Sequence, residues 1–362
     1  MRVAFIMEQH IGHRTFYENL RCYASVDPRI ESRWVEVNYF QEDGWIETSR
    51  LIPSGIKGPL RGFLQSRKGL NASPVDAAFF NTQIPAVFTM DRMKNIPTII
   101  STDITPMQYD RIAKVYGHKP DKSGLVKKIK YRINRSLFNN AAHIIAWSNW
   151  VRESLMTDYG VPENRISVIP PGVDMDLWSP AMILNDKPPM KILFVGGDFK
   201  RKGGFTLLEA YKILDRSDVE LHLVTREEVQ KIPGVFIYHH MKANSPELIK
   251  LYSQCDIFVL PSLGEAFGIV AVEALACGLP VIASKIGGLM DIIEDGKNGL
   301  LIPPGDPIAL AMAIRHLVEN HDLHMNMRYA ARKSAEDRFD AQKNSDKCVG
   351  LILEHARSND AA

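Results

Sequence analysis

The sequence predicts an α/β protein with two doubly wound domains, each built on a parallel sheet. Two observations favour this fold class. Short apolar runs alternate with amphipathic stretches of helical length along the whole chain, which is typical of parallel sheets with helices on both faces. The chain also has 362 residues, more than one ordinary core accommodates at roughly 100–200 residues per domain.

The first half of the chain shows the alternation up to a Pro-Pro-Gly break at 170–172. Its apolar runs are bounded by polar residues, as strands buried in a parallel sheet should be. A helix expected at 149–160 ends at Gly160, since glycine commonly ends helices. We expect strands within 2–7, 31–40, 77–81, 97–102 and 141–148, and helices at 13–24 and 149–160.

The second half repeats the pattern after a proline-marked segment without a clean period, which we interpret as a linker. Ser245 and Asp306 stand where the N-caps of two helices are expected. The tail from 322 to 356 is helical by pattern. We expect strands at 190–197, 219–225, 256–262 and 280–284, and helices at about 204–214, 245–255, 268–277 and 306–320.

Composition excludes several classes of protein. The hydrophobic content of 45% and charged content of 24% are normal for a globular enzyme. No apolar run approaches the ~18 residues that a membrane span needs, and the first residues form a short strand rather than a signal peptide. The cysteines lack metal or redox spacing, so we expect a reduced, cytoplasmic protein. They are Cys22, Cys255, Cys277 and Cys348.

Charge is distributed unevenly along the chain. Residues 1–172 hold 23 Lys and Arg against 16 Asp and Glu, a balance of +7, whereas residues 173–362 hold 21 against 26, a balance of −5. The segment 111–135 alone has nine basic residues and one acid. Such a patch favours anionic partners.

The stretch GEAFGIVAVEALACGLPV, residues 264–281, places two carboxylates where the sequence is otherwise apolar. Glu265 falls in a loop at the carboxyl end of a strand, and Glu273 in the second turn of a helix that starts near Gly268. The first turn of such a helix offers free N–H groups and a positive dipole end, which suit a phosphate. Eight helical residues span about 12 Å, similar to the reach of a nucleotide diphosphate sugar from ribose to sugar ring.

One carboxylate would then accept hydrogen bonds from the ribose and the other from the sugar, with the diphosphate between them. The alternative is a solvated helical Glu and a loop acid that acts as a cap. Because Glu273 has apolar neighbours on both sides in the sequence, an acid there needs a partner. That requirement favours the functional interpretation.

These residues resemble the Glu-x7-Glu signature of the retaining GT-B glycosyltransferases, of the family 4 or group 1 type. VIPPGVD resembles the family's entry to the hinge, ILFVGGDFKRKGG its phosphate loop, and IGGLMDIIEDGKNGLLIPPGD the segment after the signature. The resemblance covers about 167–306. It implies the GT-B architecture, in which two Rossmann-like domains face a cleft and ligands bind at the carboxyl ends of the strands.

The resemblance also sets the expected domain limits and roles. It implies an acceptor domain at 1–172, a linker at 173–190, a nucleotide-sugar domain at 191–340 and a helix at 341–362 that crosses back to the first domain. Glu265 would hold the sugar and Glu273 the ribose, while Arg201 and Lys202 would stabilise the charge of the leaving diphosphate. The expected donor-binding residues are Gly12, Gly197, Arg201, Lys202, Met241, Glu265, Ala266, Phe267, Gly268, Ile269 and Glu273.

In the first domain the resemblance places Gly12 in the loop after the first strand, close to the donor phosphate, and His13 and Arg14 toward the acceptor. His13 is equally well explained as a hydrated residue at a helix start. Asp103, at the end of a strand, stands where many relatives carry a histidine, and it would orient a sugar hydroxyl or stabilise positive charge on the sugar ring. A turn cap before Pro106 explains it as well. We count Glu265, Asp103, Arg201 and Lys202 as the candidate catalytic residues.

The family implies catalysis without a metal or another cofactor, with the nucleotide sugar as co-substrate. Asp174 and Asp176 form an Asp-x-Asp pattern, but in the linker rather than at a strand end, so we do not expect them to bind metal. The sequence FVGGDFKRKGG lacks the spacing of a dinucleotide fingerprint. A solvated turn remains the alternative role for Arg201 and Lys202.

The segment 124–137 has Leu125, Ile129, Ile133 and Leu137 at i, i+4 spacing among five basic residues. One hypothesis is a peripheral contact with an anionic membrane on its inner face, which would suit lipid-linked acceptors. The alternative is a surface helix that packs this stripe on the first domain. Nucleic acid is not an expected partner, since aromatic side chains are scarce in the patch.

We therefore expect a retaining hexosyltransferase that moves a sugar from a UDP- or GDP-sugar to a hydroxyl acceptor, such as a carbohydrate, a small molecule, or a lipid-linked or cell-envelope glycan in polysaccharide biosynthesis. Two alternatives stay open at this point. One is an epimerase or hydrolase of the same fold, and the other is a non-catalytic module that binds nucleotide sugars.

Overall fold

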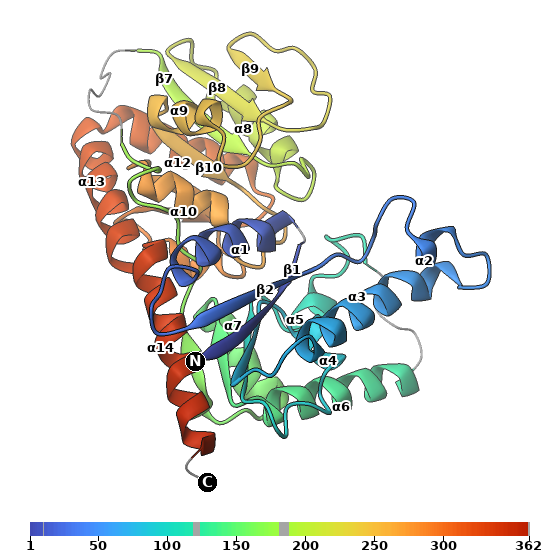
Figure 1. Cartoon of the computed structure of the whole chain (residues 1–362). Coiled ribbons are helices and arrows are strands. Elements are labelled where there is room, and N and C mark those ends of the chain that lie inside the picture. Colours follow the sequence, from blue (N-terminus) through green and yellow to red (C-terminus); the bar gives the residue numbers. More distant parts are fainter. Residues whose placement is uncertain (10, 119–123, 181–187, 361–362) are drawn as a thin grey trace. The chain divides into compact units, whose positions relative to one another are not determined.

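The computed structural model of the chain describes residues 1–9, 11–118, 124–180 and 188–360 (Figure 1). The chain divides into two compact units. Unit 1 comprises 1–111, 119–171 and 341–362, and unit 2 comprises 112–118 and 172–340. Part of the expected linker, 181–187, and part of the basic segment, 119–123, lie outside the described residues.

Unit 1 is built on a six-stranded parallel sheet with the order β2-β1-β3-β4-β5-β6. The central strands are buried on both faces, as short apolar runs predict. The strands are β1 (Arg2–Glu8), β2 (Glu31–Val37), β3 (Ala77–Phe80), β4 (Thr98–Thr102), β5 (His143–Ala146) and β6 (Ile166–Val168).

The helices of unit 1 cover this sheet, and one of them comes from the far end of the sequence. Helix α14 (Ala341–Asp360) packs against α1 (Ile11–Ala24), β3 and β5 (Figure 1). Helix α7 (Asn149–Tyr159) has Ser148 as its N-cap and Gly160, with a φ of 68°, as its C-cap. The other helices are α2 (Trp45–Thr48), α3 (Ser54–Asn71), α4 (Gln83–Val87), α5 (Pro106–Arg111) and α6 (Gly124–Asn140).

Unit 2 contains a second six-stranded parallel sheet, with the order β12-β11-β10-β7-β8-β9. Ser245 and Asp306 cap α9 and α12 through their side-chain oxygens, as predicted. Its strands are β7 (Met190–Val195), β8 (Val219–Val224), β9 (Val235–Tyr238), β10 (Ile257–Leu260), β11 (Val281–Ser284) and β12 (Gly299–Ile302). Its helices are α8 (Gly204–Leu214), α9 (Pro246–Gln254), α10 (Ile269–Ala276), α11 (Leu289–Ile292), α12 (Pro307–Glu319) and α13 (His321–Arg338).

The predicted fold class is confirmed for each unit, and the strand orders locate a switch point in both sheets. In unit 2 the chain starts at β7, builds β8 and β9 on one side, and then builds β10 to β12 on the other. In unit 1 it starts at β1, adds β2 on one side and β3 to β6 on the other. Ligands of doubly wound sheets bind at the carboxyl ends of the strands at such points. The β7/β10 and β1/β3 junctions are therefore the expected positions of ligand-binding sites.

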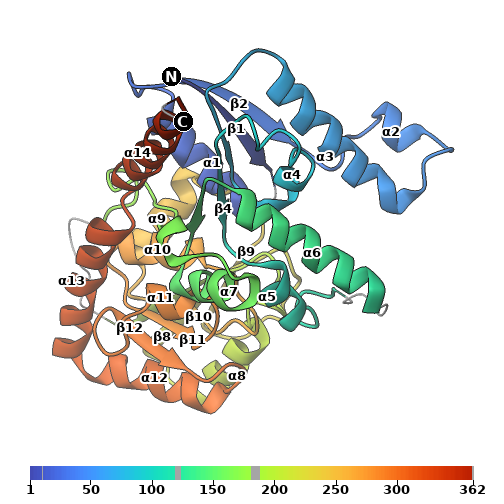
Figure 2. The same cartoon turned by 90° about the horizontal axis from the view of Figure 1, so that it is seen from below.

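Figure 2 shows α6 along one side of unit 1. Among the described residues, none of the helices combines the length and apolar character that crossing a membrane requires.

Candidate functional site

The switch point of unit 2 brings together two loops that are about sixty residues apart in the sequence. The loop after β7 carries Arg201 and Lys202, and the loop after β10 carries Glu265. A backbone hydrogen bond of 2.8 Å from Leu263 N to Arg201 O joins the loops. Gly203 makes the close approach possible, because a Cβ atom there would lie 1.9 Å from the carbonyl oxygen of Pro261.

Two cations surround the Glu265 carboxylate in this junction. Lys202 Nζ forms an ion pair with Glu265 Oε2, and Arg201 Nη1 lies 3.9 Å from the same oxygen. The three side chains are only 16%, 13% and 8% exposed for Arg201, Lys202 and Glu265, respectively. Since buried charges need partners, the cluster holds two positive groups and one negative group at a fixed place on the sheet edge.

Arg201 is further fixed by its other contacts. Its Nη1 donates to the carbonyl oxygen of Gly264 at 3.0 Å, and its guanidinium lies 4.6 Å from the centre of the Tyr116 ring. Tyr116 belongs to 112–118, the segment that is counted with unit 2 although its neighbours in the sequence lie in unit 1. A stacked guanidinium of this kind keeps its remaining N–H groups oriented.

Helix α10 begins beside the cluster, as the sequence predicts. Gly268 is its N-cap with a φ of 108°, and a Cβ atom there would meet Leu289 Cδ2 at 2.8 Å. Ala271 N donates to Gly268 O, so the amides of Ile269 and Val270 come before the first helical bond. The positive end of the α10 dipole thus adds to the two cations near Glu265.

Glu273 is buried in the second turn of α10, with 4% of its surface exposed. The hydroxyl of Tyr252 on α9 donates to Glu273 Oε2 at 3.0 Å. Burial raises the pKa of Glu273 to about 7, while the Tyr252 hydrogen bond and the positive charge of Lys202 act in the opposite direction. The Tyr252 hydroxyl is itself fully buried beside this acid, which raises its pKa well above the ordinary value. The partner that the sequence required for Glu273 is therefore Tyr252.

The other predicted donor residues follow the same edge of the unit 2 sheet. Gly197 lies in the loop after β7, where an added Cβ atom would meet Arg226 only at 3.8 Å. Ala266 and Phe267 are buried between Glu265 and α10. Met241 follows β9, two strands from β7 in the sheet order. The structure thus gathers most of the predicted donor set at the β7/β10 junction and places Met241 further along.

The switch point of unit 1 contains a buried acid that is not among the residues predicted from the sequence. Glu8 ends β1 and is 3% exposed. Its Oε2 accepts hydrogen bonds from Thr82 Oγ1 at 2.7 Å and Tyr39 Oη at 3.1 Å, and the backbone of Glu8 exchanges two hydrogen bonds with the Asn81 side chain. Burial, followed by the charge of Glu8, raises the pKa of Tyr39. The sequence contains a signal for both residues, because Glu8 directly follows one apolar run that was predicted as a strand and Asn81 ends another.

His13 and Asp103 meet in unit 1. Asp103 follows β4, and its Oδ1 lies 3.6 Å from His13 Nε2. The His13 ring also lies 5.3 Å from the Trp147 ring, and its Nδ1 is buried with no hydrogen-bond partner among the described residues. Both side chains are less than one fifth exposed, so His13 is not simply a hydrated residue at a helix start.

Gly12 is in the helix, not in the loop where it was expected. Helix α1 begins at Ile11, two residues before the predicted start, so Gly12 belongs to its first turn. Within the part of the chain that the structure describes, a Cβ atom at Gly12 would meet nothing within 4 Å. The backbone at this position is therefore open to an approaching group.

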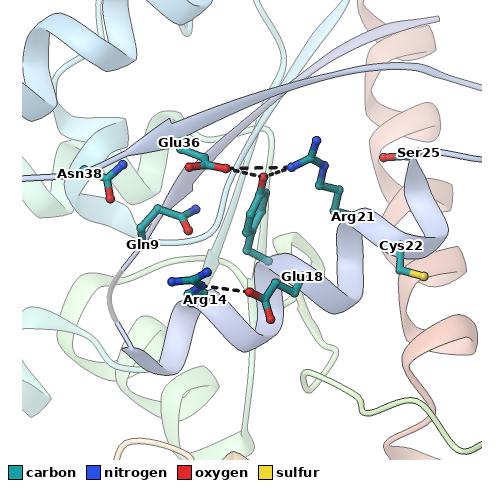
Figure 3. Close-up of a pocket in the computed structure, with 9 residues that line it drawn as sticks. Gln9, Arg14, Glu18, Arg21, Cys22, Ser25, Glu36 and Asn38 are labelled. Carbon is teal, nitrogen blue, oxygen red and sulfur yellow. Dashed lines mark hydrogen bonds and ion pairs between the residues drawn. The ribbon is translucent and has the colours of Figure 1, made fainter. Parts of the chain in front are cut away.

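Arg14 lines an open pocket on unit 1, with a volume of about 730 Å³ (Figure 3). Arg14 Nε donates to Glu18 at 3.0 Å across one turn of α1. Tyr17 donates to Glu36 at 2.8 Å, and Arg21 also contacts this pair. The lining residues come from α1, β2 and the ends of β1 and β2; they are Gln9, Arg14, Tyr17, Glu18, Arg21, Cys22, Ser25, Glu36 and Asn38.

The Asp-x-Asp pattern of 174–176 has a local role. Asp174 Oδ1 accepts hydrogen bonds from the amides of Asp176 and Leu177, at 2.9 and 3.0 Å. Its carboxylate therefore caps a turn, as Asp residues often do.

Two family models match the chain, one on each side of residue 180. Residues 39–177 match the model described as Glycosyltransferase Family 4, and residues 180–334 match the model described as Glycosyl transferases group 1. The second match contains β10, α10 and all of the cluster around Glu265.

Among curated proteins, the chain is similar to bacterial enzymes named D-inositol 3-phosphate glycosyltransferase. The protein from Paenarthrobacter aurescens (strain TC1) is 29% identical over 222 residues, 55% of this chain and 54% of the relative. The one from Arthrobacter sp. (strain FB24) is 31% identical over 188 residues, 46% of this chain and 45% of the relative. The chain thus spans about half the length of the curated relatives it matches.

Solved structures with the same fold cover nearly the whole chain. A sucrose-phosphate synthase from Thermosynechococcus elongatus aligns with a TM-score of 0.73 and 18% identity, over 98% of both chains. Anabaena HepE in complex with UDP aligns with a TM-score of 0.71 and 17% identity, over 98% of this chain and 100% of HepE. At these identities the likeness establishes the fold, which is that of GT-B glycosyltransferases.

Proposed function

Because the chain belongs to the group 1 and family 4 glycosyltransferases, we propose that it moves a sugar from a nucleotide diphosphate sugar to a hydroxyl acceptor with retention of anomeric configuration. The observation that carries the proposal is the junction of β7 and β10. There Arg201, Lys202 and the N-terminus of α10 converge on Glu265.

The diphosphate would bind to the positive groups of this junction. When the bond between the anomeric carbon and the diphosphate breaks, its electron pair passes to the leaving oxygen, and negative charge grows there. Arg201 and Lys202 are already fixed by Gly264, Tyr116 and Glu265, so they stabilise this charge without further reorganisation. A carboxylate between them, Glu265, accepts hydrogen bonds from the sugar hydroxyls.

The nucleoside would lie toward the second acid. Glu273 lies in the second turn of α10, one to two helical turns from the proposed phosphate position. Two ribose hydroxyls that donate hydrogen bonds to its carboxylate would stabilise the ionised form. Anabaena HepE, which shares the fold, was crystallised with UDP-glucose, and this supports a UDP-sugar as the donor for this chain. A GDP-sugar remains the second candidate.

The acceptor is assigned to unit 1. The pocket lined by Arg14 and Arg21 lies at the ends of β1 and β2 and suits an acceptor with polar or anionic groups (Figure 3). The names of the curated relatives specify a phosphorylated inositol, which has that chemistry. Asp103, held by His13, is the candidate to orient a hydroxyl of the reacting sugar. A lipid-linked or cell-envelope glycan also presents such hydroxyls.

The test has a binding arm and a transfer arm. Nucleoside diphosphates and their sugars are screened for stabilisation of the chain against heat, since a ligand at 100 times its Kd stabilises by about 2.7 kcal/mol. Radiolabelled donor is then incubated with acceptor pools, with wild type, Glu265→Ala and the control Glu209→Ala, an exposed acid on α8. We expect transfer by wild type and the control, and at least a hundredfold loss in Glu265→Ala.

Two results would contradict the proposal. Release of free or isomerised sugar at an equal rate with and without acceptor would indicate a hydrolase or an epimerase. Stabilisation by a nucleotide sugar without any turnover would indicate a binding module.

A further inference from the structure

Helix α6 has two apolar faces, only one of which is packed against unit 1. Leu137 and Phe138 are fully buried in the core near the C-terminal end of the helix. Nearly two turns earlier, Tyr131 stacks on Tyr159 at 5.7 Å and donates to Asp158 O at 2.9 Å. These contacts fix α6 on unit 1 from the middle of the helix to its C-terminal end.

The second apolar face extends from Leu125 to Ile133 and is exposed. Leu125 is 69% exposed, Ile129 47% and Ile133 38%. At about 100° per residue, these side chains point to about 0°, 40° and 80° around the helix axis, whereas Phe138 and Tyr131 point to about 220° and 240°. The predicted stripe is therefore split. Leu137 packs in the core, and the other three members do not.

Basic side chains flank the exposed face on both sides. Lys128, Arg132 and Arg135 point to about 300°, 340° and 280°, and Lys130 to about 140°. All of them are exposed, as is Lys127, and the sequence from Gly124 to Asn140 contains no acid. Figure 2 shows the N-terminal half of α6 at the periphery of unit 1.

We propose that the exposed face of α6, defined by Leu125, Ile129 and Ile133 and their basic flanks, binds the surface of a membrane rich in anionic lipid. An amphipathic helix with a basic polar face lies in the interface, with its apolar side chains among the acyl chains and its cations at the headgroups. The snorkelling stems of Lys and Arg permit both contacts at once.

Charge and shape disfavour the other partners for this face. A second copy of the chain in a symmetric dimer would bring two sets of five cations together without an acid on either helix. A nucleic acid would satisfy the cations, but it would leave the three aliphatic side chains in water. An anionic lipid surface satisfies both.

The test is flotation of the full chain with vesicles of phosphatidylcholine alone or mixed with phosphatidylglycerol, at low and high salt. We expect binding to the mixed vesicles only, weakened by salt as the screening length shortens. Leu125→Gln/Ile129→Gln is expected to lower the partition coefficient at least tenfold. Lys128→Gln/Arg132→Gln is expected to lower it about 25-fold, at about fivefold per charge.

The matched control is Ile308→Gln/Met312→Gln, which removes an exposed apolar i, i+4 pair from α12 of unit 2. It should bind vesicles as wild type does. Because the replaced side chains on α6 are exposed, the thermal midpoint of each variant should match wild type, and transfer to a water-soluble acceptor should be unchanged. This last readout separates the membrane contact from the proposed transferase activity.

Three outcomes would overturn the inference. The first is no flotation with any vesicle, and the second is an equal loss in the α12 control. The third is a dimer in solution that Leu125→Gln/Ile129→Gln converts to a monomer, which would assign the face to a second copy.

Discussion

The burial of Glu273 leads to a prediction in which stability and activity change in opposite directions. Glu273→Gln keeps the shape of the side chain and an oxygen that accepts from Tyr252, but it removes the ionisable group. If Glu273 has only a structural role, Glu273→Gln should stabilise the folded chain and leave the activity unchanged. If it recognises the donor, the substitution should stabilise the chain and impair the enzyme.

The size of the stability gain follows from the pKa. Burial raises the pKa of Glu273 from 4.5 to about 7. The unfolded state thus loses the proton at lower pH than the folded state does, and stability falls as pH rises from about 4.5 to about 7 and is constant above. The penalty in wild type is about 1 kcal/mol at pH 5 and about 3 kcal/mol at pH 8.5. Gln does not incur this penalty.

The assay is thermal unfolding of the full chain at pH 5 and pH 8.5, together with donor KM at pH 8.5. We expect the Glu273→Gln midpoint to exceed that of wild type by about 6–12 °C at pH 8.5 and by a few degrees at most at pH 5, at about 2–4 °C per kcal/mol. Donor KM should rise at least tenfold. An equal midpoint at pH 8.5 would refute the burial argument, and an unchanged KM with a raised midpoint would refute the role in donor binding.

Three further predictions concern single side chains. Tyr252→Phe removes the hydroxyl that orients Glu273 and should raise donor KM three- to tenfold with little change in kcat, whereas a purely structural role would lower the thermal midpoint alone. Gly12→Ala should leave stability equal or higher, because a methyl group there meets no atom of the described residues within 4 Å and Ala favours a helix. A loss of kcat/KM in this variant would therefore mark a close approach of substrate. Burial lowers the pKa of His143 from 6.5 to about 4, so wild type should lose stability as pH falls from 6.5 to 4. His143→Gln should lose less stability over this range, which urea unfolding midpoints at pH 5 and pH 7.5 would measure.

The proposed donor region was predictable from sequence because one rule applies to it. Parallel strands end at the same sheet edge, so residues that follow β7 and β10 must lie near one another however far apart they are in the chain. Arg201, Lys202 and Glu265 all follow strands that were recognised as apolar runs. The same rule applies to Glu8, which ends β1, and to Asn81, which directly follows β3, and it brings these two residues together as well.

Other features depend on three-dimensional packing that the sequence pattern does not contain. The partner of Glu273 is a tyrosine 21 residues earlier, on a helix whose rotation relative to α10 is set by the core. The apolar stripe of α6 was misjudged for a geometric reason. Steps of four residues advance by about 40° beyond a full turn, so Leu125 and Leu137 are separated by about 120° and cannot share one flat contact. Sequence spacing identified the helix but not which part of it is covered.

The two switch points differ in the partners of their buried acids, and this difference bears on which unit holds the donor. Glu8 in unit 1 accepts hydrogen bonds from the hydroxyls of Thr82 and Tyr39, whereas Glu265 in unit 2 is paired with Arg201 and Lys202. A leaving diphosphate needs positive charge within a few ångströms and out of bulk water. The β7/β10 junction supplies two poorly hydrated cations and a helix N-terminus, and these compensate Glu265 with positive charge to spare. For this reason unit 2, rather than unit 1, is the electrostatic match to the proposed nucleotide-sugar donor.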